Sequence, residues 1–213
     1  MDRIVILCNG AFPMEPYPLF LLDDAEGVVC CDGALEKLLA HNSEARPLAV
    51  VGDMDSLPQE LRERYSSLVV PVQEQEHNDM TKALRWVLEN HPEATEITFL
   101  GATGLREDHT IGNLGLLMDY PRQFALGERR LSAVSDYGTA FTVTDSCELH
   151  LGEGRRISLF SADNSLKITS EGLEWPTDEV VFDAWWKATL NRTVAPIVSL
   201  HFSHPSRVLV MVD

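Results

Sequence analysis

The chain has 213 residues, of which 45% are hydrophobic and 23% charged, with a formal net charge of −16. This balance is typical of a folded protein with one large or two small domains and excludes a disordered chain. Because nucleic acids and anionic membranes both recruit Lys and Arg, 33 acidic against 17 basic residues argue against either partner.

Short apolar runs alternate with helix-like stretches up to about residue 128. The runs show no polar alternation, which is typical of parallel strands covered by helices on both faces. We expect such strands at residues 4–8, 28–31, 48–51, 68–72 and 97–100.

Two helices are expected in this part of the chain. Residues 79–90 carry apolar side chains at helical spacing, Asn78 or Asp79 can cap the start, and Pro92 follows the end. A second helix is expected to open at Asp108 and to stop before Pro121.

The second helix has an apolar stripe interrupted by glycines. Gly112 and Gly115 weaken it by about 1 kcal/mol each relative to Ala, or else allow close backbone packing. The side chains expected to be buried are Ile111, Leu114 and Met118.

From about residue 129 onward, strand-like pieces follow one another with turns between them, at 139–144, 155–160, 166–169, 197–202 and 207–212. We therefore predict an α/β fold: an N-terminal open, mostly parallel sheet with flanking helices, then a small C-terminal antiparallel β-sandwich. The predicted domains are residues 1–128 and 129–213. Their charges differ: the first holds 9 basic and 22 acidic residues, the second 8 and 11.

The four cysteines form no CxxC pair, and most lie in or beside apolar runs. We therefore predict reduced, buried thiols in a cytoplasmic protein, in preference to a zinc site or a disulfide framework. No apolar run approaches the roughly 18 residues of a membrane span, and the N-terminus lacks signal-peptide anatomy.

Acidic residues stand where the apolar strands end or a helix begins. Ligands of an open parallel sheet bind beyond the carboxyl ends of its strands, so these loops should converge on one site. The loops are Asp32-Gly33, Gly52 to Ser56, Asn78 to Lys82, and Gly101 to His109.

Asp53 and Asp55 are two residues apart and point to a cation. Two carboxylates about 4 Å apart repel by roughly 4 kcal/mol at an effective dielectric near 20, which a bound cation relieves. Hard oxygen ligands favour Mg²⁺, which bridges to substrate phosphates. Arg106 can hold a phosphate bidentately, and Lys82, one helical turn from Asp79, can do so as a point charge.

Each acid alone also has a purely structural reading. Asp79 and Asp108 can be helix caps, Asp32 can belong to a turn, and an isolated DxD is common by chance. Their joint placement at strand ends favours a site. Neither a P-loop nor a GxGxxG is present, so a nucleotide would be held by another set of loops.

With these motifs the chain resembles the thiamine pyrophosphokinases. GDxDS and GxxGxRxDH together are highly specific, although each alone is weak. In the family's order the matching pieces are Asn9-Gly10, Asp32-Gly33-Ala34, Pro47 through Gly52-Asp53-Met54-Asp55-Ser56, Asn78 to Leu84, Gly101 to His109 with Asn113-Leu114 after it, Gly172-Leu173-Glu174-Trp175-Pro176, and Asn191.

The resemblance implies an N-terminal α/β domain and a C-terminal β-sandwich, in a homodimer that holds thiamine at the subunit interface. It implies transfer of the β,γ-pyrophosphoryl group of ATP to the thiamine hydroxyl, with Mg²⁺, giving thiamine diphosphate and AMP. Carried over by motif, the Mg²⁺ site would comprise Asp53, Asp55 and Asp79. The nucleotide or its phosphates would contact Asp32, Asn78 and Arg106, with Lys82 supplying further positive charge.

On the acceptor side, the resemblance puts Asp108 near the transferring group or the substrate hydroxyl, and Trp175 and Asn191 against thiamine. Asp79, Arg106 and Asp108 are therefore the expected catalytic residues. An aromatic face such as that of Trp175 is worth about 0.5–2 kcal/mol to a cationic ring. For the adjacent Trp185 and Trp186 we prefer core or interface packing.

Four positions depart from the family pattern: Asn78 for Thr, Leu105 for Gly, Glu174 for Lys and Leu190 for Ser. Since the last two touch the acceptor side, the motifs also fit a pyrophosphokinase that acts on a different alcohol. The DxD alone fits a metal-dependent hydrolase or glycosyltransferase, and a nonenzymatic sensor of thiamine or nucleotide could carry the same residues.

Overall fold

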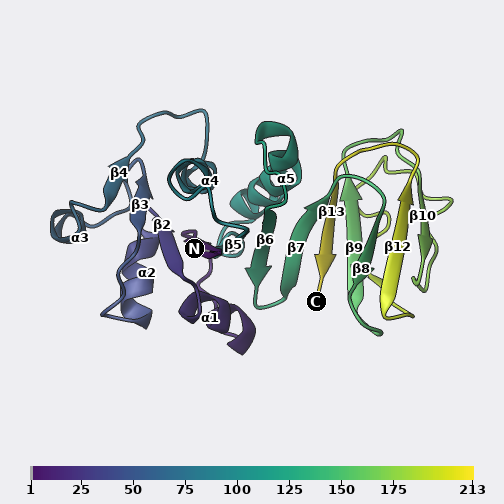
Figure 1. Cartoon of the computed structure of the whole chain (residues 1–213), viewed down its shortest axis with the longest axis horizontal. Helices are drawn as coiled ribbons and strands as arrows, with labels where there is room; N and C mark the ends of the chain where they lie inside the picture. The colour runs from purple at the N-terminus through teal and green to yellow at the C-terminus, as the bar shows by residue number, and fades with distance from the viewer. Residues whose placement is uncertain (1) are drawn as a thin grey trace. The chain divides into compact units, whose positions relative to one another are not determined.

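The computed structural model describes residues 2–213, which divide into two compact units (Figure 1). The first comprises residues 2–116 and 126–136, and the second residues 117–125 and 137–213. The predicted domain boundary at residue 128 stays a prediction.

The first unit contains a six-stranded parallel sheet in the order β6-β5-β1-β2-β3-β4. Five of its strands and their parallel direction were predicted. The sixth, β6, was not, because Arg130–Ser135 carries no continuous apolar run. The strands are β1 (Arg3–Leu7), β2 (Gly27–Cys31), β3 (Ala49–Gly52), β4 (Val69–Pro71), β5 (Glu96–Leu100) and β6 (Arg130–Ser135).

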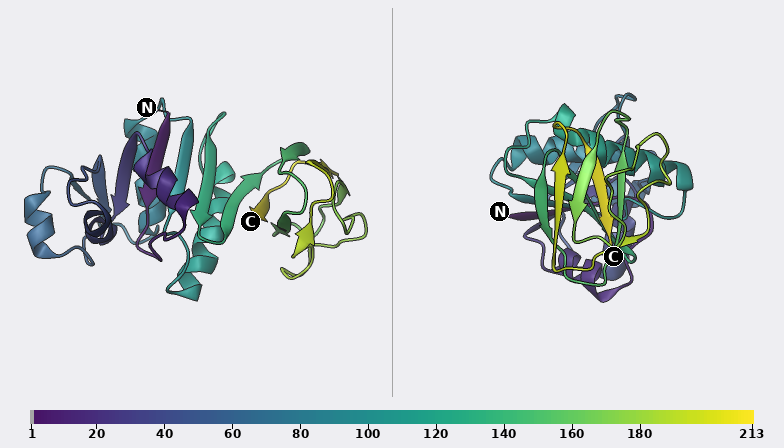
Figure 2. Two further views of the ribbon diagram at one scale, coloured as in Figure 1. Left: turned by 90° about the horizontal axis from the view of Figure 1, so that it is seen from below. Right: turned by 90° about the vertical axis from the view of Figure 1, so that its right-hand side faces the viewer.

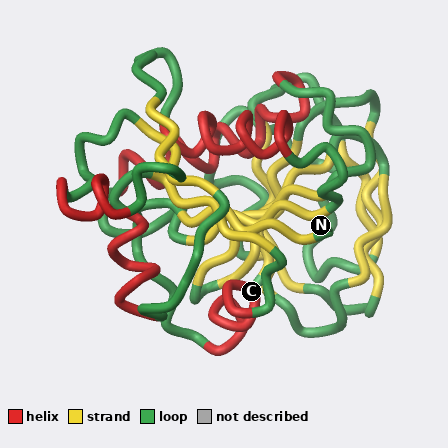
Figure 3. The backbone as a smooth tube through the Cα atoms, turned by 60° about the vertical axis from the view of Figure 1, so that its left-hand side comes forward, coloured by secondary structure: helices red, strands yellow, loops and turns green. Residues whose placement is uncertain are grey.

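Helices cover the sheet on both faces, as Figure 3 shows with helices in red and strands in yellow. Alternate strand residues such as Val5 and Leu7 pack with α1 (Pro16–Asp23) and α2 (Ala34–His41), beside the short α3 (Gln59–Arg64). On β1 the intervening residues are also fully buried. Each buried Leu or Ile contributes about 1.5–3 kcal/mol, so this core fixes the positions of the strand ends.

The helix expected at residues 79–90 is confirmed as α4 (Asp79–Asn90). Its cap is Asn78, whose Oδ1 accepts hydrogen bonds from the backbone N–H and the hydroxyl of Thr81, each at 3.0 Å. Asp79 is therefore the first helical residue, and its carboxylate is not used for capping.

The second expected helix differs in its bounds. α5 (Glu107–Gln123) begins one residue before Asp108 and continues past Pro121. The first turn closes through the backbone N–H of Thr110, which donates to the carbonyl of Arg106 (3.1 Å), so Asp108 is not needed as a cap. Pro121 has no N–H to donate to the carbonyl of Leu117, four residues earlier, and the hydroxyl of Thr142 donates to that carbonyl instead (2.9 Å).

The buried face of α5 also differs from the prediction. Leu117 and Tyr120 are buried, whereas Ile111 is 55% exposed and Leu114 and Met118 are half-buried. The glycines of this helix face open space, so close backbone packing within the chain does not explain them.

The second unit is a β-sandwich of two antiparallel sheets, ordered β11-β9-β13-β7 and β10-β12-β8, whose green to yellow strands can be followed in Figure 2. Its core joins Leu159 and Val210 from one sheet to Val198 and Leu200 from the other. The predicted sandwich is confirmed, with β8 and β11 as strands that were not predicted. The strands are β7 (Gly138–Val143), β8 (Cys147–His150), β9 (Arg156–Ser161), β10 (Ile168–Glu171), β11 (Asn191–Arg192), β12 (Ile197–Phe202) and β13 (Val208–Val212).

None of the helices within residues 2–213 is both long and apolar enough to cross a membrane. The four cysteines are free; Cys8, Cys30 and Cys31 are buried and Cys147 is half-buried.

Candidate active site

A cleft of about 530 Å³ lies in the first unit, where the parallel strands end. It is lined by the loops that follow β1, β2, β3, β4 and β5. Strand order reverses between the neighbours β1 and β5, the point at which open α/β sheets bind ligands. Gly10 brings the two loops together: its N–H donates to the carbonyl of Gly101 (2.8 Å), and a Cβ there would collide with that oxygen.

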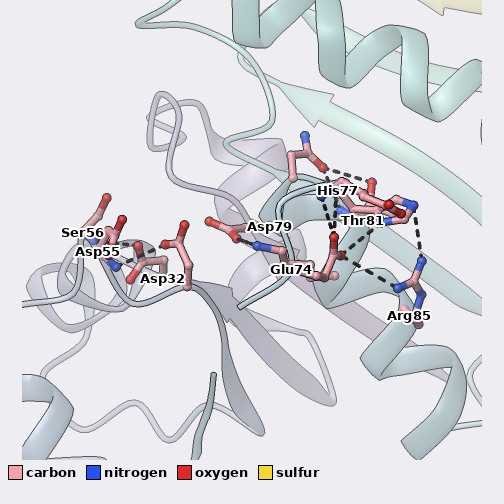
Figure 4. A network of polar contacts seen from close by, with 12 residues as sticks. Asp32, Asp55, Ser56, Glu74, His77, Asp79, Thr81 and Arg85 are labelled. Atoms are coloured by element: carbon pink, nitrogen blue, oxygen red, sulfur yellow. Dashed lines mark hydrogen bonds and ion pairs between the residues drawn. The ribbon is translucent and has the colours of Figure 1, made fainter. Parts of the chain in front are cut away.

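Three carboxylates converge in this cleft. Asp32 follows β2, Asp53 follows β3 and Asp79 opens α4, and they place one oxygen each within 4.8 Å of one another. Figure 4 shows the carboxylates of Asp32 and Asp79 facing each other. Gly52 permits this approach, because a Cβ would lie only 3.0 Å from Cβ of Asp32 and 3.2 Å from Cγ of Asp79.

Asp32 is the most constrained of the three. It is only 3% exposed and adopts a left-handed backbone with φ of 43°. Its Oδ2 accepts a hydrogen bond from the backbone N–H of Ser56 (2.8 Å), whereas the buried Oδ1 has no hydrogen-bond partner within residues 2–213. Burial raises the pKa of the Asp32 carboxyl, and the nearby Asp53 adds to the shift.

One buried lysine partly offsets this negative charge. Lys82 is 4% exposed, and its Nζ lies 3.2 Å from Oδ1 of Asp79. Burial raises the pKa of Asp79 despite the opposing effect of Lys82. The three carboxylates carry more negative charge than the single ammonium group offsets, so a bound cation would be stabilised there. The donor atoms are all oxygens, and one of them is buried without a partner among residues 2–213, which fits Mg²⁺.

Asp55 lies apart from this cluster. Its side chain is exposed, and its backbone N–H donates to Oδ1 of Asp53 (3.2 Å). Between them, Met54 has a φ of 69° and buries its side chain in the core, so the two acids diverge. The sequence spacing alone did not show this turn.

Asn78 links two walls of the cleft. While its Oδ1 caps α4, its Nδ2 donates to Oδ1 of Asn113 on α5 (2.7 Å). Nδ2 of Asn113 in turn donates to the carbonyl of Ala102 (2.6 Å). Asn113 belongs to the motif match, which gave it no role, and it lines the cleft.

Arg106 and Asp108 form a bidentate pair near the start of α5. Nε of Arg106 lies 3.1 Å from Oδ1 of Asp108, and Nη2 lies 2.5 Å from Oδ2. Both side chains are exposed, and Arg106 lines the cleft. The hydrogen bonds from Arg106 hold the pKa of Asp108 below its usual range.

The loop before α4 supplies cleft residues that sequence reasoning missed, namely Gln75, Glu76 and His77. Glu74 organises this loop by accepting hydrogen bonds from the backbone N–H groups of Glu76 (2.8 Å) and His77 (3.0 Å) (Figure 4). Arg85 of α4 lies 4.0 Å from the same carboxylate. The signal that could have identified Gln75, Glu76 and His77 in the sequence was their position after the fourth strand, at the edge where the other acidic loops converge.

Two of the expected acceptor residues, Trp175 and Asn191, lie in the second unit, whereas Asp108 lies in the first. The Asn191 side chain is buried; its Nδ2 donates to the carbonyl of Trp175 (2.7 Å), and its Oδ1 accepts from the N–H of Trp175 (3.2 Å). This clamp leaves the Trp175 ring 56% exposed. Neighbouring Leu190 is exposed, with a left-handed φ of 55°.

Trp185 and Trp186 are both exposed, so neither lies in the core of the second unit. Trp185 contacts the ring of Phe160 edge-on, with 6.5 Å between centroids, and Lys187 lies over Trp186.

Solved structures show the same fold. Yeast thiamin pyrophosphokinase matches with a TM-score of 0.79 at 15% identity, covering 100% of this chain and 86% of that one. The enzyme of the same description from Geobacillus thermodenitrificans matches with a TM-score of 0.75 at 23% identity, covering 99% and 97%.

Curated relatives match in sequence. Thiamine pyrophosphokinase 1 of Oryza sativa subsp. japonica is 28% identical over 201 residues, or 82% of this chain and 73% of that protein. Thiamine pyrophosphokinase of Bacillus subtilis (strain 168) is 37% identical over 75 residues, or 33% of this chain and 34% of that protein.

Two family descriptions cover most of the chain in order. Residues 20–126 match "Thiamin pyrophosphokinase, catalytic domain", and residues 138–210 match "Thiamin pyrophosphokinase, substrate-binding domain". These matches confirm the resemblance that the motifs indicated. With the acidic cleft in the part that matches the catalytic domain, and Trp175 in the other, the chain belongs to the thiamin pyrophosphokinase family.

Proposed function

We propose that the residues described above carry out thiamine pyrophosphokinase activity, which follows from the family. The hydroxyl oxygen of thiamine bonds to the β-phosphorus of ATP, the bond from that phosphorus to the α,β-bridging oxygen breaks, AMP leaves, and the hydroxyl proton is released to water. The observation that carries the assignment of the site is the buried Oδ1 of Asp32, which has no hydrogen-bond partner among residues 2–213 and lies within three converging carboxylates.

Mg²⁺ fits this cluster and would neutralise charge on the phosphates when bound. Asp32, Asp53 and Asp79 would hold it. Because Mg²⁺ usually keeps several waters, we propose that the outlying Asp55 contributes through that water shell.

The remaining polar groups of the cleft would position the nucleotide. Lys82 and Arg106 supply positive charge to the phosphates, and Asn78 is proposed to contact them from the cap of α4. Phosphoryl-type transfer depends mainly on such positioning and charge stabilisation.

Asp108 is proposed to orient the acceptor hydroxyl. Its pKa is lowered by Arg106, so it stays ionised and accepts a hydrogen bond from the hydroxyl. A carboxylate of low pKa is a weak base, so its contribution is orientation more than early proton removal.

On the acceptor side, we propose that the thiazolium ring of thiamine stacks on Trp175. Asn191 acts through its clamp on the Trp175 backbone, because its amide is already engaged there. In this scheme the nucleotide-binding and thiamine-binding domains divide near residue 128.

We further propose that the protein is a homodimer, since the phosphate side and the thiamine side lie in different units and a two-fold partner can complete each site. Light scattering should give about twice the chain mass of 23.8 kDa. An active monomer at the assay concentration would contradict this proposal.

We place the reaction in the cytoplasm. Four free cysteines, three of them buried, fit a reducing compartment in which thiols persist.

Mass spectrometry of the products from ATP, Mg²⁺ and thiamine tests the function. We expect AMP and thiamine diphosphate in equal amounts, and no AMP when thiamine is omitted. Inorganic phosphate released without an acceptor would indicate a phosphohydrolase, and AMP formed only with another alcohol would indicate a different acceptor.

A further inference from the structure

Leu105 stands at the tip of an unusually tight turn between β5 and α5. Its φ is 65°, in the left-handed region that favours glycine, and it follows Gly104, whose φ is 78°. The backbone N–H of Arg106 donates to the carbonyl of Gly104 (2.9 Å) across Leu105. A hydrogen bond between residues two apart, with positive φ at the residue between them, is the rare and strained form of the γ-turn.

The fold gains little from a leucine at this position. Its side chain is 72% exposed and so contributes little to any core. A left-handed backbone is unfavourable for a side chain with a Cβ, and glycine would avoid that cost. Strain that packing does not offset is found at functional sites, and here it holds an apolar side chain exposed in the cleft.

Leu105 also lines the nucleotide cleft. Other apolar residues of the cleft wall, including Cys8, Cys31 and Met80, are buried beneath its surface. Among the lining residues that the structure describes, Leu105 is the exposed large apolar side chain, and it directly precedes Arg106.

We propose that Leu105 packs against the base of ATP and is a specificity-determining residue for the nucleotide. This inference rests on the proposed function, in which Arg106 binds the phosphates. The base is the planar, largely apolar part of the molecule that carries those phosphates, whereas the proposed platform for thiamine, Trp175, lies in the second unit. Contact with the base covers the exposed leucine and offsets the strain of the turn.

Calorimetric binding of α,β-methylene ATP with Mg²⁺ tests the inference in three variants. Leu105→Gly and Leu105→Asn, both compatible with a left-handed backbone, should weaken binding by about 3- to 10-fold, the range for losing part of an apolar contact. Leu105→Met keeps an apolar side chain and should bind within about twofold of the wild type. Inorganic tripolyphosphate, which has no base, should bind Leu105→Gly and the wild type equally.

Thermal unfolding separates this role from a structural one. Leu105→Gly should unfold about 1–3 °C higher than the wild type while binding the nucleotide less tightly. The matched control is Ile111→Gly, which removes another exposed apolar side chain from helical backbone; it should unfold at lower temperature and bind the analogue normally.

Unchanged affinity of Leu105→Gly for the ATP analogue would overturn the inference. An equal loss of affinity for the analogue and for tripolyphosphate would also overturn it. A higher KM for thiamine with normal nucleotide binding would reassign Leu105 to the acceptor and overturn it as well. If the wild type binds no ATP analogue, the proposed function itself is wrong, so the two failures are distinguishable.

Discussion

In the first unit a buried carboxylate oxygen of Asp32 has no hydrogen-bond partner among residues 2–213, whereas in the second unit the buried side chain of Asn191 bonds to backbone through both its polar ends. The first arrangement is costly until a ligand arrives, because an unpaired buried polar group loses its hydration. The second is complete without a ligand and presents the exposed ring of Trp175.

This contrast separates two tasks. The acidic cleft must stabilise charge during transfer, so its carboxylates lie close together and Oδ1 of Asp32 is left without a partner among the described residues. The Trp175 loop must recognise an acceptor, for which a rigid, satisfied backbone and one exposed aromatic face suffice. Changes to the carboxylate cluster should therefore affect turnover, and changes at the Trp175 loop should affect the affinity for thiamine.

The largest expected effect is that of Asp53→Asn. Turnover, measured as AMP formation, should fall by at least about 10²-fold, as for the loss of a key electrostatic group. The matched change Asp55→Asn should lower it only about 10-fold, because Asp55 lies outside the cluster of three carboxylates. Both variants should keep the wild-type circular dichroism; near-normal turnover of Asp53→Asn would refute the metal assignment.

Trp175→Ala should raise the KM for thiamine by about 2- to 30-fold while leaving the KM for ATP unchanged, since a cation over an aromatic face is worth about 0.5–2 kcal/mol. Leu190→Ser is the paired variant. One added hydrogen bond can improve thiamine affinity only several-fold, which is less than Trp175→Ala loses. A larger effect of Trp175→Ala on ATP than on thiamine would break the division of tasks between the units.

Asp108→Asn should lower turnover yet bind ATP about threefold more tightly. The reason is that Arg106 is freed from its bidentate partner and becomes fully available to phosphate. Calorimetry with α,β-methylene ATP measures this, and Glu107→Gln controls for the loss of one nearby negative charge. Equal gains in both variants would show that general charge, and not the Arg106 pair, is responsible.

The smallest expected effects are changes in unfolding temperature, compared between two carboxylates whose pKa values are shifted in opposite directions. Asp32→Asn should raise the unfolding temperature of the metal-free protein by about 2–4 °C at pH 7, because it removes a desolvated charge. The folded pKa of Asp32 is raised above the ordinary value of about 3.9. The wild type therefore gains stability as pH falls through that raised pKa, and the difference between the proteins should shrink there.

Asp163 in the second unit should behave oppositely. Its carboxylate accepts hydrogen bonds from Ser165, His204 and Ser206, which lower its pKa. Its stabilising contribution is present above about pH 4 and is lost as pH falls through the folded pKa. Asp163→Asn should therefore unfold about 2–4 °C lower at pH 7, and the exposed Asp178→Asn should not change the unfolding temperature.

Much of the fold was predictable because it depends on local pattern. The unbroken apolar run of β1 marks a strand buried on both faces, and Asn78 with Pro92 bounds α4. Elements with weak local signals were missed: β6 has no continuous apolar run, and β11 is only two residues long.

The sequence by itself determined which residue types reach the active edge, because the carboxyl ends of parallel strands must lie together there. It could not determine which acids meet. The left-handed turn at Met54 separates Asp55 from Asp53, and the close approach across Gly52 admits Asp32 in its place. These outcomes depend on backbone angles and on contacts between residues far apart in the chain, and such contacts exist only once the strands have paired and the core has closed.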